Sequence, residues 1–467
     1  MKNVLLVSAN QEKMPYPVAP LGLLFVAHAL KKSGFGVSIL DLCFSDNIHD
    51  DIKKAVKQKN PDFIGVSLRN VDNLTFPKSV SYLPVIREII RTIKRYTTAP
   101  LILGGSAFSL FPKEILSFMD CEWGVVGEGE EALVELLKCF SSGGKNLKTI
   151  VNLVRRQENR IYSNQVKCLQ SPFDFVLDYS LINNRLYAKY SGMANVQTKR
   201  GCKFECAYCT YPLIEGKSYR LRSPEVISEE VVLLQKKYAM PHIFFVDDVF
   251  THPDKHASLV CEALLKKNVK ASWSCFASPY AISKKLLILM KKAGCTHIEF
   301  GSDALSDRVL VKMRKPFTVK EILRVSSLCK EIGIKCAHYI IFGAPGENNA
   351  SLKEAFATIR KLQGDAIIAM IGIRIYPKTE LERISISERI ISKKTDLLSP
   401  HFYLSRELSV NKLLEQVAKF ARENPYCVVP GLEIRSSEKM YTVLRKHYHQ
   451  GPPWGYLAQI KPEISGR

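Results

Sequence analysis

KRGCKFECAYCT, residues 199–210, places three cysteines, Cys202, Cys206 and Cys209, in a CxxxCxxC spacing. Three thiolates can ligate three irons of a cubane iron–sulfur cluster and leave the fourth iron open. Electron-transfer clusters normally have a fourth cysteine, and structural zinc sites close four ligands. The other ten cysteines are scattered singly, without CxxC or CxxH companions. We therefore predict an open-sided 4Fe-4S cluster on this loop, with a three-cysteine zinc site and a distant fourth ligand as the alternative.

Length and composition predict a large soluble enzyme. A chain of 467 residues divides into about three domains, and its 46% hydrophobic and 24% charged residues are ordinary globular values. The N-terminal apolar run is too short for a signal peptide, and the longest apolar stretch, residues 366–377, contains Arg374, so we expect no membrane span. Thirteen cysteines without a pairing framework favour a reducing compartment, which predicts a cytoplasmic protein.

The net charge of +22 is spread along the chain. Lysine pairs such as Lys31–Lys32, Lys236–Lys237 and Lys291–Lys292 lie in predicted amphipathic helices. There is no basic run of the kind that marks a nucleic-acid arm, so solvated helix faces explain the charge best. Nucleic acid is therefore not an expected partner, although an acidic substrate or RNA stays open as the alternative.

Residues 1–142 alternate strand and helix. The strand-like runs are residues 4–8, 37–41, 63–67, 101–104 and 123–126. Such βα repetition predicts a Rossmann-like domain with a parallel sheet, helices on both faces and a ligand across the carboxyl ends of the strands. At those ends, residues 67–72 follow the third strand and Gly104-Gly105-Ser106 follows the fourth. Paired glycines there allow a ligand to lie against the backbone.

This pattern resembles the cobalamin-binding domain, in which a small-residue loop after the third strand and a Gly-Gly after the fourth surround the nucleotide tail. The resemblance implies that cobalamin contacts Pro17, Ser67, Arg69, Asn70, Gly104, Gly105 and Ser106. A Rossmann-like fold that holds no ligand is the alternative.

The first-strand loop departs from the best-known cobalamin domains. Those domains carry Asp-x-His-x-x-Gly there, and the histidine is the lower cobalt ligand, whereas residues 8–22 contain no histidine. We therefore expect cobalamin without a histidine lower ligand. Arg69 is expected beneath the corrin, because a guanidinium fills that space without a lone pair to donate. A salt bridge from Arg69 to Asp72 or to another local carboxylate is the alternative.

The rest of the chain predicts a linker, a barrel and a cap. Residues 143–190 are irregular and are interpreted as a linker. Residues 191–385 contain six βα units, which predict an open (β/α)6 partial TIM barrel with the cysteines on its carboxyl-end rim. The expected strands are residues 195–198, 242–246, 272–277, 297–300, 335–342 and 367–375. Residues 386–467 are expected to form a mostly helical cap, whose aromatic residues either line the pocket or pack in the core.

The cysteine loop, with Tyr208 inside it, resembles the signature of the radical S-adenosylmethionine (SAM) superfamily, whose members chelate SAM at the open iron. The resemblance implies that SAM is held by Tyr208, Asp247, Asp248, Asp303, Gly343, Glu347 and Arg374. Asp247 or Asp248 would face the SAM ammonium group or the substrate, with helix capping as an equal alternative. Asp303 would hold the ribose hydroxyls, and Gly343 and Glu347 belong to a turn beside the adenine. Arg374 is an isolated charge in an apolar run and needs a buried partner, for which the SAM carboxylate or a substrate anion is suitable.

The order of the parts resembles the cobalamin-dependent radical SAM family across nearly the whole chain. The resemblance implies a methyltransferase for an unactivated carbon or phosphorus centre of a small-molecule, lipid-precursor or peptide substrate. It also implies an electron donor such as flavodoxin or ferredoxin. Ring formation or rearrangement without methyl transfer, and RNA modification, are the alternative activities.

Overall fold

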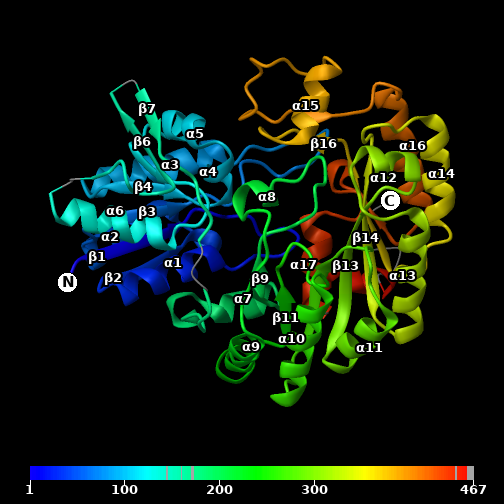
Figure 1. Ribbon diagram of the computed structural model, residues 1–467, viewed down its shortest axis with the longest axis horizontal. Helices are drawn as coiled ribbons and strands as arrows, with labels where there is room; N and C mark the ends of the chain where they lie inside the picture. The colour runs from blue at the N-terminus through cyan, green and yellow to red at the C-terminus, as the bar shows by residue number, and fades with distance from the viewer. Residues whose placement is uncertain (144–145, 159, 170–172, 448–449, 460–467) are drawn as a thin grey trace.

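Two seven-stranded sheets organise the protein, one in each half of Figure 1. The computed structural model describes residues 1–143, 146–158, 160–169, 173–447 and 450–459. The first sheet and its helices, residues 3–163, are called the N-terminal half of the molecule, and the second sheet forms a partial barrel in the C-terminal half. The predicted α/β fold class is confirmed.

The N-terminal sheet has the strand order β2-β1-β3-β4-β5-β6-β7. Its parallel strands are β1 (Asn3–Ser8), β2 (Gly36–Asp41), β3 (Phe63–Ser67), β4 (Leu101–Gly104) and β5 (Trp123–Val125). Successive residues of β1 face opposite sides, so that Leu5 packs in one core and Leu6 in another. Helices cover both faces: α1 (Leu21–Lys32), α2 (Ile48–Lys59), α3 (Leu83–Tyr96), α4 (Ser106–Leu110), α5 (Pro112–Met119) and α6 (Glu130–Ser141).

Part of the predicted linker belongs to this sheet. Strands β6 (Leu153–Gln157) and β7 (Arg160–Ser163) form a hairpin that pairs antiparallel with β5. The interpretation of residues 143–190 as a linker alone was therefore wrong for this hairpin. The chain then passes through α7 (Asn184–Tyr190) into the barrel.

The barrel sheet has the strand order β18-β15-β14-β13-β12-β11-β8, and every pair in it is parallel. Its strands are β8 (Ala194–Val196), β11 (His242–Phe245), β12 (Ser272–Ala277), β13 (Cys295–Asp303), β14 (Lys335–Phe342), β15 (Ala366–Ile371) and β18 (Cys427–Val428). The prediction of six strands missed β18, which comes from the expected cap and pairs with β15. A strand of two residues is too short to produce an alternating pattern in the sequence.

The predicted sixth strand is also divided. It ends at Ile371, and β16 (Ile373–Arg374) continues in a separate pair with β17 (Phe402–Tyr403). A second two-stranded pair, β9 (Lys199–Arg200) with β10 (Arg220–Leu221), encloses the cysteines and α8 (Tyr211–Ile214).

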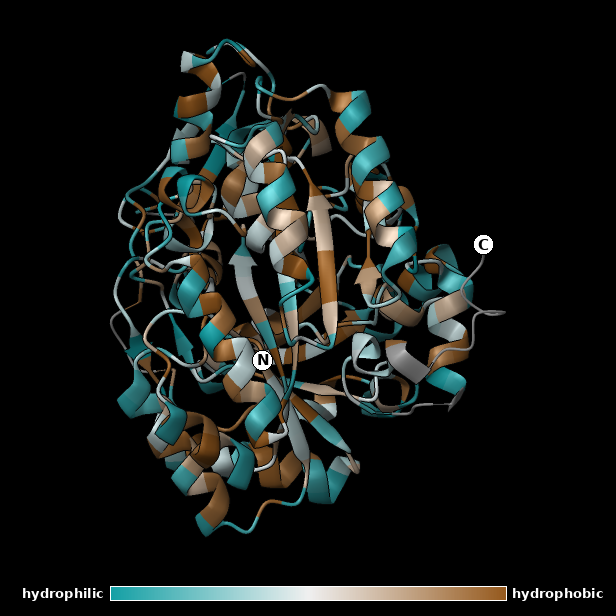
Figure 2. Ribbon diagram, turned by 90° about the vertical axis from the view of Figure 1, so that its right-hand side faces the viewer, coloured by the Kyte–Doolittle hydropathy of each residue, from teal (hydrophilic) through white to brown (hydrophobic). Residues whose placement is uncertain are grey.

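Amphipathic helices surround the barrel strands. In Figure 2 their outer faces are largely hydrophilic, whereas much of the sheet behind them is hydrophobic. They are α9 (Pro224–Tyr238), α10 (Asp254–Lys266), α11 (Lys284–Lys292), α12 (Asp307–Lys312), α13 (Val319–Ile332) and α14 (Asn349–Ile359). The remaining helices are α15 (Glu380–Ser387), α16 (Val410–Glu423) and α17 (Glu438–His447), and a 3-10 turn, η4 (Pro453–Gln459), closes the described chain. None of the described helices combines the length and apolar character needed to cross a bilayer.

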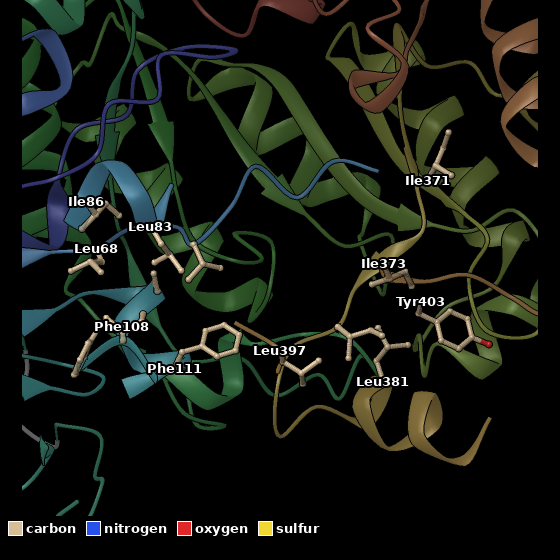
Figure 3. Packing of buried hydrophobic residues seen from close by; sticks show 14 of the residues in the cluster. Leu68, Leu83, Ile86, Phe108, Phe111, Ile371, Ile373, Leu381, Leu397 and Tyr403 are labelled. Atoms are coloured by element: carbon tan, nitrogen blue, oxygen red, sulfur yellow. The ribbon is translucent and has the colours of Figure 1, made fainter. Parts of the chain in front are cut away.

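A shared hydrophobic core joins the two halves. Figure 3 shows Leu68 and Phe111 of the N-terminal half in the same cluster as Leu381, Leu397 and Tyr403 of the C-terminal half. Burial of apolar area of this kind stabilises the contact between domains. The shared core therefore fixes the position of the carboxyl ends of one sheet relative to those of the other.

Candidate functional site

A cavity of about 630 Å³ lies between the two halves. One wall comes from the strand ends of the N-terminal sheet, including Ser8, Ser67 and Gly104. The opposite wall comes from the barrel and includes Asn195 and Phe244. Its volume is within the range of small-molecule and cofactor sites. The cavity is thus the place where both sheets can act on one ligand.

Six of the seven residues predicted to contact cobalamin line this cavity: Ser67, Arg69, Asn70, Gly104, Gly105 and Ser106. Pro17 is not among the lining residues, although its neighbours Tyr16 and Val18 are. Gly105 has a φ of +95°, and a Cβ there would lie 2.5 Å from the Leu68 carbonyl oxygen. The packing of two loops therefore requires this glycine, independently of any ligand.

No histidine is found among the described residues that line the cavity. His28 lies outside it, with its ring stacked on Phe175 at a centroid distance of 3.5 Å. Asp72, which was the alternative partner for Arg69, is paired with Arg374 instead. The Arg69 side chain is exposed at the cavity wall. The described wall of the cavity therefore offers a ligand the side chain of Arg69 and no histidine.

The cysteine loop, residues 199–210, is held at several points. The Cys202 N–H donates to the Gly216 carbonyl at 3.1 Å, and the Ala207 N–H donates to the Met313 carbonyl at 3.0 Å. Arg200 and Thr210, at the two ends of the loop, both line the cavity. The loop is thus fixed at the barrel rim with its cysteines beside the cavity.

The cysteine thiols suit an iron cluster. Burial, followed by the charge of Cys206, raises the pKa of Cys209 to about 12. Burial, followed by the charge of Asp248, also raises the pKa of Cys202. Bound iron reverses such shifts because its positive charge favours the thiolate. The residues present fit a cluster because three free thiols share one loop, which is the ligand set of an open-sided cubane.

A preformed site for one metal ion is absent from the part of the chain that the structure describes, since no three His, Cys, Asp or Glu side chains are close enough to hold one. The alternative of a zinc site thus gains no support from the described residues. In a cubane, each thiolate ligates a different iron, so the cysteines need not meet at one point.

A buried polar cluster adjoins the cysteine loop. The Tyr208 hydroxyl donates to Asp303 Oδ2 at 2.7 Å, and Lys315 forms an ion pair with the same carboxylate. Lys315 Nζ also lies 3.3 Å from Cys206 Sγ. The structure therefore brings two predicted residues, Tyr208 and Asp303, beside a ligating cysteine. The sequence analysis missed Lys315, which lies in an otherwise ordinary basic stretch.

The two aspartates after β11 differ in their environments. Asp247 accepts hydrogen bonds from the backbone N–H groups of Thr198 and Lys199, at 2.7 and 3.2 Å, and lies 3.4 Å from Lys199 Nζ. It therefore ties β11 to the start of the cysteine loop. Asp248 is near Cys202, and its Oδ2 is buried without a partner among the described residues. Of the two, Asp248 is the one that retains an acceptor for a ligand.

Gly343 and Glu347 form a closed turn after β14. The Gly343 N–H donates to the Glu347 carboxylate, and the Ser405 hydroxyl donates to the Glu347 carbonyl at 2.6 Å. Glu347 is 2% exposed, and burial raises its pKa to about 7. The turn shapes the rim, and neither residue lines the large cavity.

Arg374 requires a correction. A buried partner was expected, and the partner is Asp72 of the N-terminal half, at 2.8 Å from Arg374 Nε. The other guanidinium nitrogens donate to the carbonyls of Ile375 and Leu397, both at 2.7 Å. With these partners Arg374 is committed to the domain contact, so the assignment of its charge to SAM or a substrate anion was wrong.

Several residues of the cavity were missed. They are Asn10, Tyr16, Asn195, Gln197, Tyr211, Glu215, Phe244, Phe276 and Tyr376. Burial raises the pKa of Glu215 to about 7. None of these residues belongs to a spaced motif. Position in or after a strand could have indicated some of them, such as Asn195 and Phe244, but not Tyr211 and Glu215, which lie in and just after α8.

The comparisons with known proteins agree with this layout. Residues 196–359 match the radical SAM superfamily, and residues 8–137 match the B12 binding domain. An uncharacterised methyltransferase of Pyrococcus horikoshii is 26% identical over 414 residues, which cover 86% of each chain. The tryptophan 2-C-methyltransferase of Streptomyces laurentii is 21% identical over 456 residues, covering 84% of this chain and 76% of that protein.

A solved structure has the same fold. The radical SAM methyltransferase TsrM of Kitasatospora setae, with cobalamin and a 4Fe-4S cluster bound, superimposes with a TM-score of 0.87 at 21% identity. The superposition covers 100% of this chain and 98% of that one.

Proposed function

The chain belongs to the cobalamin-dependent radical SAM enzymes, and we propose that it transfers a methyl group to an unactivated carbon or phosphorus centre of a small molecule. The observation that carries the proposal is the shared cavity. Both ends of the cysteine loop and the predicted cobalamin loops line the same space. A methyl donor and a radical source must reach one substrate atom, and this arrangement brings their binding residues together.

We propose that Cys202, Cys206 and Cys209 hold the cluster and that Ser67, Arg69, Asn70, Gly104, Gly105 and Ser106 hold cobalamin. Together with SAM, these groups supply one-electron chemistry and a transferable methyl group. Lys315 places a positive charge beside Cys206, and Asp248 offers a free acceptor next to Cys202. The shared hydrophobic core limits the access of water from one side of the cavity.

The relatives support the methyl-transfer assignment. Besides the two proteins above, a hopanoid C-3 methylase of Methylococcus capsulatus is 24% identical over 372 residues. The anaerobic magnesium-protoporphyrin IX monomethyl ester cyclase of Rubrivivax gelatinosus is 23% identical over 359 residues. Ring formation without methyl transfer is therefore the second candidate, and the mass of the product distinguishes the two.

The test is anaerobic reconstitution with iron, sulfide and cobalamin, followed by incubation with SAM that carries a deuterated methyl group. We expect the label in a product identified by mass spectrometry from candidate metabolites. The variant with alanine at Cys202, Cys206 and Cys209 is the inactive control. Cys121→Ala, at a cysteine that does not line the cavity, is the matched control. A product that contains no labelled methyl group in the active enzyme would remove the assignment.

We also propose a flavodoxin- or ferredoxin-type electron donor and a location in the cytoplasm. A net charge of +22 favours a negatively charged protein partner, because complementary charge accelerates association. Reduction of the cluster by such a donor should slow as ionic strength rises. A rate that does not change with salt would contradict the electrostatic part of this proposal.

A further inference from the structure

Arg445 is an unmatched cation beside the barrel. The three arginines that are most buried each pair with a carboxylate: Arg200 with Glu128 and Glu130, Arg222 with Glu230, and Arg374 with Asp72. Arg445, on α17, has no carboxylate within ion-pair distance in the described ranges. Its Nη1 donates to the Gly451 carbonyl at 3.2 Å.

The rest of the Arg445 guanidinium lacks partners within the described part of the chain. Its Nε and Nη2 are buried and have no hydrogen-bond acceptor among the residues that the structure describes. Buried donors of this kind are rare because each loses its bonds to water without replacement. Burial correspondingly lowers the pKa of Arg445 to about 10, while nearby tyrosines, Tyr16 first among them, act in the opposite direction. Two adjacent N–H groups without acceptors match the geometry of an oxyanion.

Arg445 lies directly behind the wall of the large cavity. Its guanidinium carbon is 5.8 Å from the ring centroid of Tyr16, and Tyr16 lines the cavity. Phe244 lies 6.5 Å from Tyr16 and 4.9 Å from Phe276, as measured between ring centroids, so this part of the wall is aromatic. Tyr16 belongs to residues 9–20, which form neither helix nor strand, and its ring contacts both the cavity and the Arg445 guanidinium.

Glu299, an acidic group on the same side of the barrel as Tyr16, already has hydrogen-bond partners. Glu299, on β13, accepts hydrogen bonds from the Tyr339 hydroxyl at 2.8 Å and from Trp454 Nε1 at 2.9 Å. Both of its oxygens therefore have neutral donors, and it forms no ion pair with Arg445 in the described structure. Among the residues that the structure describes, no carboxylate supplies the charge that Arg445 requires.

We propose that Arg445 binds the anionic group, a carboxylate or a phosphate, of the substrate. The apolar body of the substrate then lies against Tyr16, Phe244 and Phe276, toward the cysteine loop and the cobalamin loops. An anionic substrate class makes the proposed methyl transfer more specific. That the ligand is a substrate rests on the proposed function.

Binding of small acids to the reconstituted enzyme tests the inference without turnover. The probes are indole-3-carboxylate, its neutral carboxamide, and phenyl phosphate, and calorimetry measures the dissociation constants. We expect at least one of the two acids to bind about tenfold or more tightly than the carboxamide, because a charge-assisted contact is lost in the amide. The two acids separate a carboxylate site from a phosphate site.

Variants then locate the contact. Arg445→Gln should reduce the affinity for the acid to that of the carboxamide, and Arg445→Lys should restore part of it, since it keeps the charge without the guanidinium fork. Lys439→Gln, an exposed change on the same helix, should bind the acid as the wild type does. Cobalamin and iron content verify that each variant has folded around its cofactors.

The outcomes separate this inference from the proposed function. Equal binding of acid and amide, no binding of either acid, or undiminished acid binding by Arg445→Gln would each overturn the inference. Acid binding that depends on Arg445 supports it even if no labelled methyl group appears in any product, and that second result would overturn methyl transfer alone.

Discussion

The contact between the two halves and the barrel beside α17 hold buried arginines in opposite states. At the contact, Arg200 lies 3.0 Å from Glu128 and 2.6 Å from Glu130, and Arg220 also pairs with Glu128. Beside the barrel, Arg445 has two buried donors without acceptors among the described residues. A matched buried charge maintains architecture, whereas an unmatched one is free to bind a ligand.

The two states also differ in energy. Removal of one member of a buried ion pair leaves its partner unpaired, which costs about 3–5 kcal/mol. Removal of an unpaired buried cation relieves a desolvation cost. Substitutions in the two regions should therefore change stability differently.

The largest effect, on turnover and cluster content, is expected at the cysteine loop. Alanine at Cys202, Cys206 and Cys209 should abolish turnover and cluster content, because only these three cysteines share a loop. Iron and sulfide analysis of the reconstituted protein measures this. Full cluster content in the triple variant would show that the cluster is bound elsewhere.

Arg200→Met should destabilise the protein by about 3–5 kcal/mol, because it leaves Glu130 buried without its cation. Denaturant unfolding of the cofactor-free protein measures the free energy. Exposed Lys217, which pairs with exposed Glu205, provides the control, and Lys217→Met should cost less than about 1 kcal/mol. Equal effects of the two substitutions would contradict a structural role for the paired network.

The pH dependence of stability should identify Glu347. Its pKa is about 7 in the folded protein, above the ordinary glutamate value, so the unfolded state releases its proton first as pH rises. The contribution of this group to stability is therefore greatest below the unfolded pKa and declines as pH rises to about 7. Glu347→Gln should remove this decline, on the order of 1–3 kcal/mol, when unfolding at pH 5 and pH 7.5 is compared. An unchanged pH profile would show that Glu347 does not titrate in this range.

Arg445→Met should leave stability within about 1 kcal/mol of the wild type or raise it, because the variant loses a desolvated charge that has no carboxylate partner. The same unfolding measurement applies. A decrease in the free energy of unfolding as large as that of Arg200→Met would show that Arg445 has a structural partner. Both regions would then hold paired arginines.

The smallest effect is expected for Arg69→Lys. The variant should still bind cobalamin, because the other lining residues are unchanged, but remethylation of the cofactor should slow or a new axial ligand should bind. Electron paramagnetic resonance of the cob(II)alamin form detects such a ligand. Unchanged spectra together with unchanged turnover would remove Arg69 from the lower face.

Much of the fold followed from local pattern. The spacing of the cysteines, the βα alternation and the loops after β3 and β4 were all readable within short windows of the chain. The missed elements were β18, which has two residues, and the hairpin of β6 and β7 inside an irregular stretch. Short edge strands depend on their neighbours for pairing, so local pattern carries little signal of them.

The sequence by itself determined which chemistry the chain can support, because three thiolates on one loop and glycines after parallel strands act through their immediate neighbours. Only the tertiary structure decided which charges are matched. Arg374 and Asp72 are 302 residues apart, yet they form an ion pair of 2.8 Å, while Arg445 lies behind Tyr16 with two donors unused among the described residues. The physical reason is that a buried charge depends on what surrounds it in space, and partners brought together by folding leave no periodic trace along the chain.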